Sequence, residues 1–156
     1  MRDYAVTLEP WNLDLWAEVE ALTIAHFEEV DGGVEPNRPF KPDQRLLALI
    51  SEAGAFKVII AREAGKLIGY FTWNITPDVE SEGLLIGQQG AWYVAPGHPC
   101  VALTMFRKSV EELRALGVQC IYPHHRTQGR GAHLGRFFKR QGAKEIQHTY
   151  SMWIGA

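Results

Sequence analysis

Cysteine is scarce in this sequence. Its 156 residues include two, Cys100 and Cys120, and neither lies in a Cys-x-x-Cys pattern. The chain therefore lacks the disulfide framework that is typical of small secreted domains. It also lacks any segment near the roughly 20 apolar residues that a membrane-spanning helix needs, and its first residues form no signal-like apolar run. We expect a protein of the reducing cytoplasm that does not associate with membranes.

Internal repeats, low-complexity tracts and linkers are absent as well, which excludes repeat architectures and gives no sign of a domain boundary. With 46% hydrophobic residues, the chain has enough apolar side chains to form a core of its own. Its length is typical of one domain, so we predict a single domain over residues 1–156.

Basic side chains are nearly missing from the N-terminal part of the chain, and acidic side chains are missing from a long stretch of its C-terminal part. Residues 1–35 hold nine acidic side chains and one base, Arg2, whereas residues 113–144 hold seven bases and no acid. The formal net charge of -2 conceals this asymmetry. A basic C-terminal half indicates an anionic ligand there. The competing interpretation is a solvated helix face beside a basic loop.

Hydrophobic periodicity and turn residues predict the element order β-α-α-β-β-β-α-β-α-β. The predicted strands cover residues 3–8, 56–62, 67–75, 84–94, 118–122 and 143–154, and the predicted helices cover 10–30, 43–54, 101–116 and 133–141. Asp43 is the expected N-cap of the second helix, residues 63–66 form the expected hairpin turn, and Gly87 or Gly90 is the expected bulge. The strand–helix–strand unit over 92–122 predicts a right-handed parallel crossover, so the fold class is α/β (α+β mixed).

The most informative stretch is a strand that ends in a Pro/Gly turn and leads into a helix. It reads Val94-Ala-Pro96-Gly-His98-Pro-Cys100, and an amphipathic helix follows. Such a turn leaves backbone N–H groups at the helix start that suit a phosphate. A second glycine-rich stretch, Arg126-Thr-Gln-Gly129-Arg-Gly131, has arginines that would add charge-assisted contacts to phosphate.

These elements and motifs resemble the GNAT superfamily of acyl-CoA-dependent N-acetyltransferases over nearly the whole chain. Val94-Ala95-Pro96 matches the V-x-P strand end of that family, and the phosphate loop falls on Pro99, Ala102 and Thr104 without the usual Gln or Arg. Residues 138–143 align with the Y-E-K-x-G-F-like end of a later helix. The chain is also similar to small acetyltransferase-like proteins of phage genomes. The resemblance implies a GNAT-like central mixed sheet of about six to seven strands flanked by about four helices, with strands 4 and 5 splayed.

The resemblance also implies transfer of an acetyl group from acetyl-CoA, as cosubstrate, to an amine of a small molecule or protein. The second glycine-rich stretch comes too late for the family's first phosphate loop, because one helix and one strand are predicted after Gly131. We expect it beside the cleft between the splayed strands. The predicted cofactor-binding residues are Tyr93, Val94, Gly97, His98, Val101, Ala102, Thr104, Arg126, Gly129 and Gly131.

The usual family acid is a tyrosine at the position of Phe138, and phenylalanine has no proton to donate. Replacement acids and bases come from the loops and strands on either side of the cleft: Tyr122, His124, His125, Tyr150, Glu80 and Glu82. We assign catalysis to His124, Glu82 and Tyr122, with a backbone N–H near Val94 as the oxyanion donor that the resemblance implies. The alternative interpretation is structural: solvated loop carboxylates, and tyrosines packed with satisfied hydroxyls.

A second class of function is a catalytically eroded GNAT-fold module that binds nucleic acid or another anionic partner through its basic C-terminal half. A third is a GNAT-fold enzyme that acts on a nucleic-acid base. Nucleic acid is the less favoured partner, because the bases are not dense and the N-terminal half is acidic. A homodimer is compatible with exposure of the aromatics Trp11, Trp16 and Trp153. No metal site is predicted, since no standard zinc pattern matches the spacing of His98, Cys100, Cys120, His124 and His125.

Overall fold

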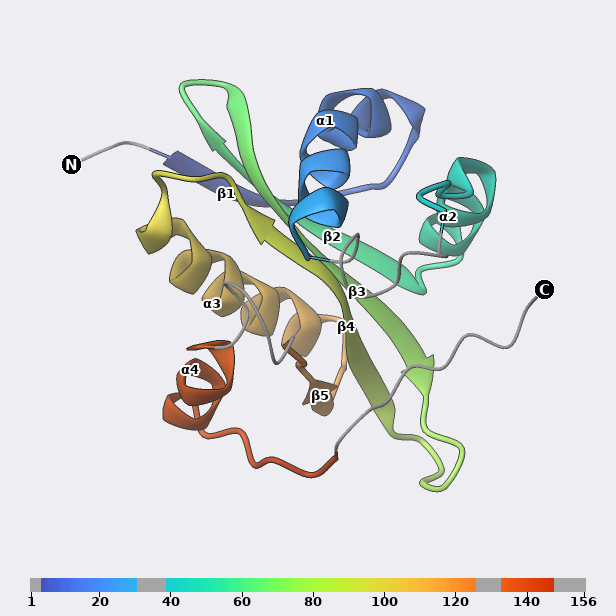
Figure 1. Ribbon diagram of the computed structural model, residues 1–156. Helices are drawn as coiled ribbons and strands as arrows, with labels where there is room; N and C mark the ends of the chain where they lie inside the picture. The colour runs from blue at the N-terminus through green and yellow to red at the C-terminus, as the bar shows by residue number, and fades with distance from the viewer. Residues whose placement is uncertain (1–3, 31–38, 126–132, 148–156) are drawn as a thin grey trace.

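Nine helices and strands make up the part of the protein that this computed structural model describes, residues 4–30, 39–125 and 133–147. In chain order they are β1 (Tyr4–Glu9), α1 (Leu13–Val30), α2 (Gln44–Glu52), β2 (Phe56–Glu63), β3 (Lys66–Pro77), β4 (Leu85–Val94), α3 (Pro99–Ala115), β5 (Cys120–Tyr122) and α4 (Leu134–Arg140). The strands form one mixed sheet in the order β1-β2-β3-β4-β5, and only β4 and β5 run parallel (Figure 1). The predicted mixed fold class is confirmed.

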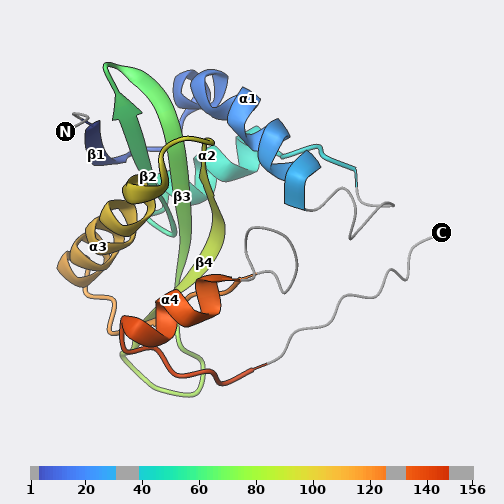
Figure 2. The ribbon, with the colours of Figure 1, turned by 60° about the vertical axis from the view of Figure 1, so that its left-hand side comes forward.

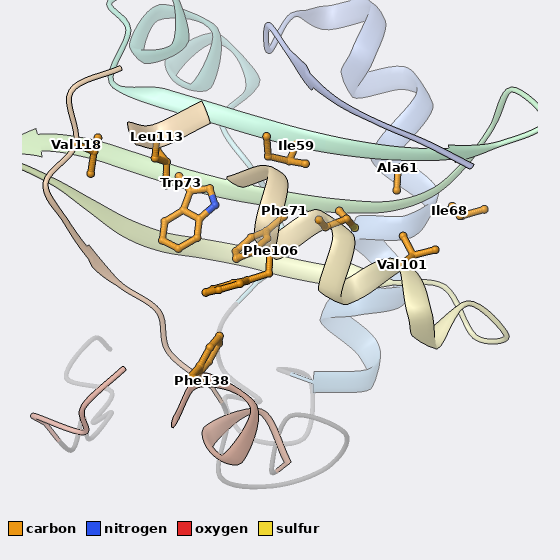
Figure 3. Packing of buried hydrophobic residues seen from close by; sticks show 11 residues of the cluster. Ile59, Ala61, Ile68, Phe71, Trp73, Val101, Phe106, Leu113, Val118 and Phe138 are labelled. Atoms are coloured by element: carbon orange, nitrogen blue, oxygen red, sulfur yellow. The ribbon is translucent and has the colours of Figure 1, made fainter. Parts of the chain in front are cut away.

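The sheet lies between two layers of helices. Helices α1 and α2 cover one side, which we call the α1 face, and helices α3 and α4 cover the other, the α3 face (Figure 2). The core on the α3 face includes Phe71, Trp73 and Phe106 (Figure 3). Because both faces are covered, successive residues of β2 are buried regardless of which way they point, as at Ile59 and Ile60.

Turn residues fix the ends of these elements. Between β2 and β3, Ala64 and Gly65 both have positive φ, 49° and 80°, as the type I′ hairpin turn requires. The Asp43 carboxylate accepts a hydrogen bond from the Leu46 N–H at 3.0 Å, which confirms the predicted N-cap of α2. Gly97, with a φ of 90°, makes the turn from β4 into α3.

Two predictions about the sheet are wrong. The described residues form five strands rather than six or seven, and residues 143–147, predicted to begin a final strand, belong to none. This segment stays with α4 instead: the Ala143 N–H donates to the Phe138 carbonyl at 3.1 Å, and Glu145 pairs with Lys139 at 2.8 Å. The remainder of the predicted strand, residues 148–154, lies outside the described residues.

Candidate active site

The parallel strands β4 and β5 separate after a short ladder. Their paired residues are Ile86 with Cys120, Gly87 with Ile121 and Gln88 with Tyr122. Strand β4 then continues to Val94 beside β3, whereas in the described residues its other edge has no further ladder. We call the point of separation after Gln88 and Tyr122 the fork. The prediction of splayed strands is confirmed, and the strands part six residues before β4 ends at Val94.

A side chain replaces the backbone ladder at the fork. The Gln89 amide donates from Nε2 to the His124 carbonyl at 2.9 Å and accepts from the His124 N–H at 3.2 Å. These two bonds reproduce what a peptide group does in a sheet, so the backbone leaving β5 keeps its partners. Gln89 is only 8% exposed, so its buried side chain holds β4 and the backbone that leaves β5 at a defined separation.

A bulge in β4 follows directly. The register against β3 passes from Gln89 to Trp92, so that Gly90 and Ala91 together face Thr72. The Thr72 hydroxyl accepts a hydrogen bond from the Ala91 N–H at 2.7 Å. A methyl group on Gly90 would lie 2.4 Å from that hydroxyl oxygen, so the close approach requires glycine. Of the two bulge positions predicted, Gly90 is the one confirmed.

On the α3 face beyond the bulge, the aromatic side chains pack into a closed cluster. Trp92 stacks on Phe71 with ring centroids 4.4 Å apart, and its ring lies 6.0 Å from that of Phe138 on α4. Phe138 is 5% exposed (Figure 3). The position where the family tyrosine is expected is thus filled by an apolar ring, which is part of the core.

On the α1 face, Tyr93 belongs to a group of polar aromatic and ionisable side chains. Its hydroxyl donates to Glu29 Oε2 at 3.1 Å, and its ring stacks on the His26 imidazole with centroids 5.0 Å apart and planes at 19°. The His26 Nδ1 lies 2.7 Å from the Tyr70 hydroxyl oxygen. We call these four residues the His26 cluster. They join the end of α1 to β3 and β4 beside the bulge.

The turn from β4 into α3 leaves the helix start without a side-chain cap. The N-cap residue His98 makes no capping hydrogen bond with its side chain. Its imidazole lies 3.7 Å from Glu63 instead. Gly97 is exposed, and an added Cβ on it would meet nothing within 4 Å. Uncapped N–H groups at the start of a helix suit an anion.

The predicted cofactor-binding residues that the structure describes lie at the end of β4, in this turn and in the first turns of α3, but their side chains point in different directions. Tyr93 is part of the His26 cluster, Val101 is 2% exposed in the core, and Thr104 lies 3.3 Å from the Tyr4 hydroxyl. The side chains of Tyr93 and Val101 are thus used in packing, and the Val101 N–H donates to the His98 carbonyl at 3.1 Å. The predicted residues outside the described part of the chain are Arg126, Gly129, Gly131 and Tyr150.

Tyr122 lies at the end of β5, beside the fork. The hydrogen bond to Cys120 and the charge of that sulfur raise the pKa of the Tyr122 hydroxyl, with smaller contributions from burial and from Asp78 and Glu80. A raised pKa keeps the proton on the tyrosine at neutral pH and makes it a weaker acid. Because Tyr122 pairs with Gln88, it lies about 20 Å along β4 from the turn into α3.

The other two predicted catalytic residues, His124 and Glu82, lie in different parts of the structure. The backbone of His124 is bonded to Gln89, so this histidine lies at the fork, and its side chain is exposed. Glu82 is exposed in the loop between β3 and β4. The carboxylates of that loop that raise the pKa of Tyr122 are Asp78 and Glu80.

Three residues of this site were not predicted: Thr72 and Gln89 beside the fork, and His26 against Tyr93. Two adjacent glutamines ahead of Gly90, in an otherwise apolar strand, are the one signal that could have indicated Gln89. His26 has no such signal, because its partners come from two strands far away in the sequence.

Among the described side chains, no group of three or more His, Cys, Asp or Glu is arranged to hold a metal ion. The described helices include none that is both long and apolar enough to span a membrane.

Solved structures of acetyltransferases share this fold. An aminoglycoside acetyltransferase from an uncultured soil metagenomic sample matches with a TM-score of 0.75 and 18% identity, over 98% of this chain and 99% of its own. A ribosomal-protein-alanine N-acetyltransferase from Brucella melitensis biovar Abortus 2308 matches with a TM-score of 0.69 and 18% identity, over 98% and 100%. The chain has the fold of the GNAT acetyltransferases.

A predicted acetyltransferase from Clostridium acetobutylicum, solved with acetyl-CoA, shares the GNAT fold with a TM-score of 0.64 and 15% identity, over 99% of this chain and 97% of its own. No family model and no curated protein matches the sequence. At these identities the similarity establishes the GNAT fold, and each relative's substrate is a property of that relative.

Proposed function

We propose that this GNAT-fold protein transfers an acetyl group from acetyl-CoA to a primary amine of a small molecule or a protein. The observation that carries the proposal is the fork. Strand β5 leaves β4 after Gln88, and β4 continues past the bulge to a glycine turn that leads into α3. A thin, extended molecule with a diphosphate at one end suits a path of this kind.

In this proposal, the turn into α3 holds the diphosphate. Backbone groups at Val94, Gly97, His98 and Ala102 contribute the contacts, because this helix start has no side-chain cap. Arg126, Gly129 and Gly131, which follow β5 in the sequence, are proposed to add phosphate contacts.

The reacting end of acetyl-CoA, its thioester, is proposed to lie near the bulge, where β4 and β5 part. The Ala91 N–H already donates to Thr72. The oxyanion donor is therefore proposed from the backbone between the bulge and Val94. Tyr122 and His124 lie at the fork and are proposed as acids for the leaving sulfur. Glu82 is proposed as the base for the amine. A thiol has a pKa of about 8.5, so a thiolate leaves without full protonation and Phe138 is compatible with transfer.

Binding of acetyl-CoA tests the proposal directly. Acetyl-CoA at about 100 times its Kd should stabilise the fold by about 2.7 kcal/mol, measured as a rise in Tm. Thiol release with an amine present then measures transfer. An unchanged Tm at millimolar acetyl-CoA, together with DNA or RNA binding that weakens steeply with salt, would favour the non-catalytic alternative.

Arg126, which follows β5 in the sequence, has a matched control on α4. Arg126→Ala should weaken acetyl-CoA binding more than Arg136→Ala, because Arg136 is exposed and contacts His133 on its own helix. The comparison is made by calorimetric titration of both variants. Equal affinities would mean that Arg126 is an ordinary surface charge.

A further inference from the structure

Helix α2 carries two leucines on its outer side. Leu46 and Leu49 are 54% and 62% exposed, whereas Leu47 and Ile50 on the inner side of the helix pack on the core of the α1 face. The exposed positions of α4, by contrast, hold charged side chains such as Arg140. Neighbouring leucines that are exposed one helical turn apart indicate a surface that another polypeptide covers.

Leu13 extends this apolar surface onto α1. It is 64% exposed, and the Trp11 N–H, two residues earlier, donates to Ser51 Oγ on the last turn of α2 at 3.2 Å. The start of α1 therefore lies beside the end of α2 (Figure 1). The exposure of Trp11 that would suit a homodimer is not found, because its side chain is 6% exposed. Trp16 is half-buried, so the exposed apolar side chains here are leucines.

Opposite charges flank Leu49 on the outer side of α2. Arg45 and Glu52 are both exposed, and among the described residues neither has an ion-pair partner. Seven residues make almost two helical turns, so these two side chains point the same way, about 10.5 Å apart along the helix. Leu49 lies between them, and Leu46 lies on its other flank. We call Arg45, Leu46, Leu49 and Glu52 the α2 surface.

The α2 surface is complementary to itself. We propose that it binds the α2 surface of a second copy of this chain, with the two helices antiparallel and related by a two-fold axis beside Leu49. This rotation reverses the order of residues on each flank, so Arg45 of each copy lies opposite Glu52 of the other. The Leu49 side chains meet at the axis, and the Leu46 side chains lie together on the other flank. One cation and one anion, evenly placed about a leucine, favour a second copy over a partner of different charge.

The small size of this surface predicts a reversible dimer. Stable dimers typically bury about 800 Å² per copy, and a helix of nine residues with Leu13 beside it offers less. We expect a Kd on the order of 10 µM that depends mainly on the leucines. Exposed ion pairs add little affinity, but Arg45 and Glu52 would select the antiparallel orientation. Since α2 packs mainly on β2 and the fork lies between β4 and β5, the inference does not depend on acetyl transfer.

The first test measures self-association of the full chain by analytical ultracentrifugation between about 1 µM and 1 mM. Leu49→Glu should raise the Kd about 100-fold, because it places two carboxylates at an apolar contact. Leu116→Glu is the control: this leucine is also exposed, at 42%, but it follows α3 on the opposite face, and its Kd should match wild type. Both variants should keep the Tm of the wild-type monomer, measured at about 1 µM, since neither side chain is buried.

The second test exchanges the charges. Arg45→Glu gives the α2 surface two carboxylates and Glu52→Arg gives it two cations, so each variant alone should raise the homodimer Kd about tenfold at low salt. Mixed in equal amounts, the two variants should form a heterodimer close to wild type in affinity, because every charge then faces an opposite one. This rescue is specific to the antiparallel two-fold arrangement.

Three results would each overturn the inference. Wild type could remain a monomer at about 1 mM, which is 100 times the expected Kd, and the α2 surface would then meet only solvent or a partner of other chemistry. A dimer with an unchanged Kd in Leu49→Glu would be joined through another part of the molecule. Charge variants that fail to form the heterodimer would exclude the pairing of Arg45 with Glu52.

Discussion

Gly90 controls the shape of β4 at the scale of a single residue. In Gly90→Ala, the new methyl carbon lies 2.4 Å from Thr72 Oγ1, which already accepts from the Ala91 N–H. The threonine must move and release that bond, so the free energy of unfolding should fall by about 1–3 kcal/mol in urea titrations. In a Thr72→Ala background the methyl group has room, and the same substitution should cost less. Strictly additive losses would contradict this explanation.

Phe138 is a core residue where an acid is expected, and its neighbour serves as its control. Phe138→Ala removes a ring that is 5% exposed and packs on Trp92 and Phe106, so it should destabilise the fold by about 3–5 kcal/mol. Phe137 is only half-buried, and Phe137→Ala should cost less. Thermal unfolding of both variants makes the comparison, and equal losses would mean that Phe138 is not part of the core.

At the scale of elements, Gln89 holds β5 to β4 where the ladder ends. Gln89→Ala removes both amide bonds to the His124 backbone. Amide exchange at His124 should then accelerate by about tenfold, because each such bond contributes on the order of 1 kcal/mol. The adjacent Gln88→Ala is the control, since Gln88 is exposed. Unaltered exchange in Gln89→Ala would show that the fork keeps its width without this side chain.

At the scale of the whole molecule, the two halves of the core share their strands. Ile59 belongs to the cluster on the α3 face and Ile60 to the cluster on the α1 face, although they are neighbours in β2. We expect one cooperative unfolding transition, with the same Tm by near-UV and far-UV circular dichroism. Ile59→Val and Ile60→Val should each lower stability by about 0.5–1.5 kcal/mol and shift both signals together. Separate transitions would mean that the faces unfold independently.

Prediction from the sequence succeeded where the signal is local. The Asp43 cap and the hairpin turn at 63–66 were located from residue type and spacing, and Gly90 was one of the two glycines at which a bulge was expected. Each of these features depends on backbone conformations that few residues adopt. The final strand was misplaced at residues 143–147. That segment's partners, Lys139 and the Phe138 carbonyl, are supplied by the preceding helix, and no periodicity reveals such pairing.

By itself, the sequence determined the order of the nine described helices and strands, from β1 to α4, and the Pro/Gly turn between β4 and α3, since periodicity and turn residues act over a few positions. Only the tertiary structure decided that the fork opens after Gln88, that Gln89 bridges it, and that His26 lies against Tyr93. The physical reason is that each of these contacts joins segments far apart in the chain. Their geometry depends on how two layers of helices pack on one sheet, a property that no short stretch of residues contains.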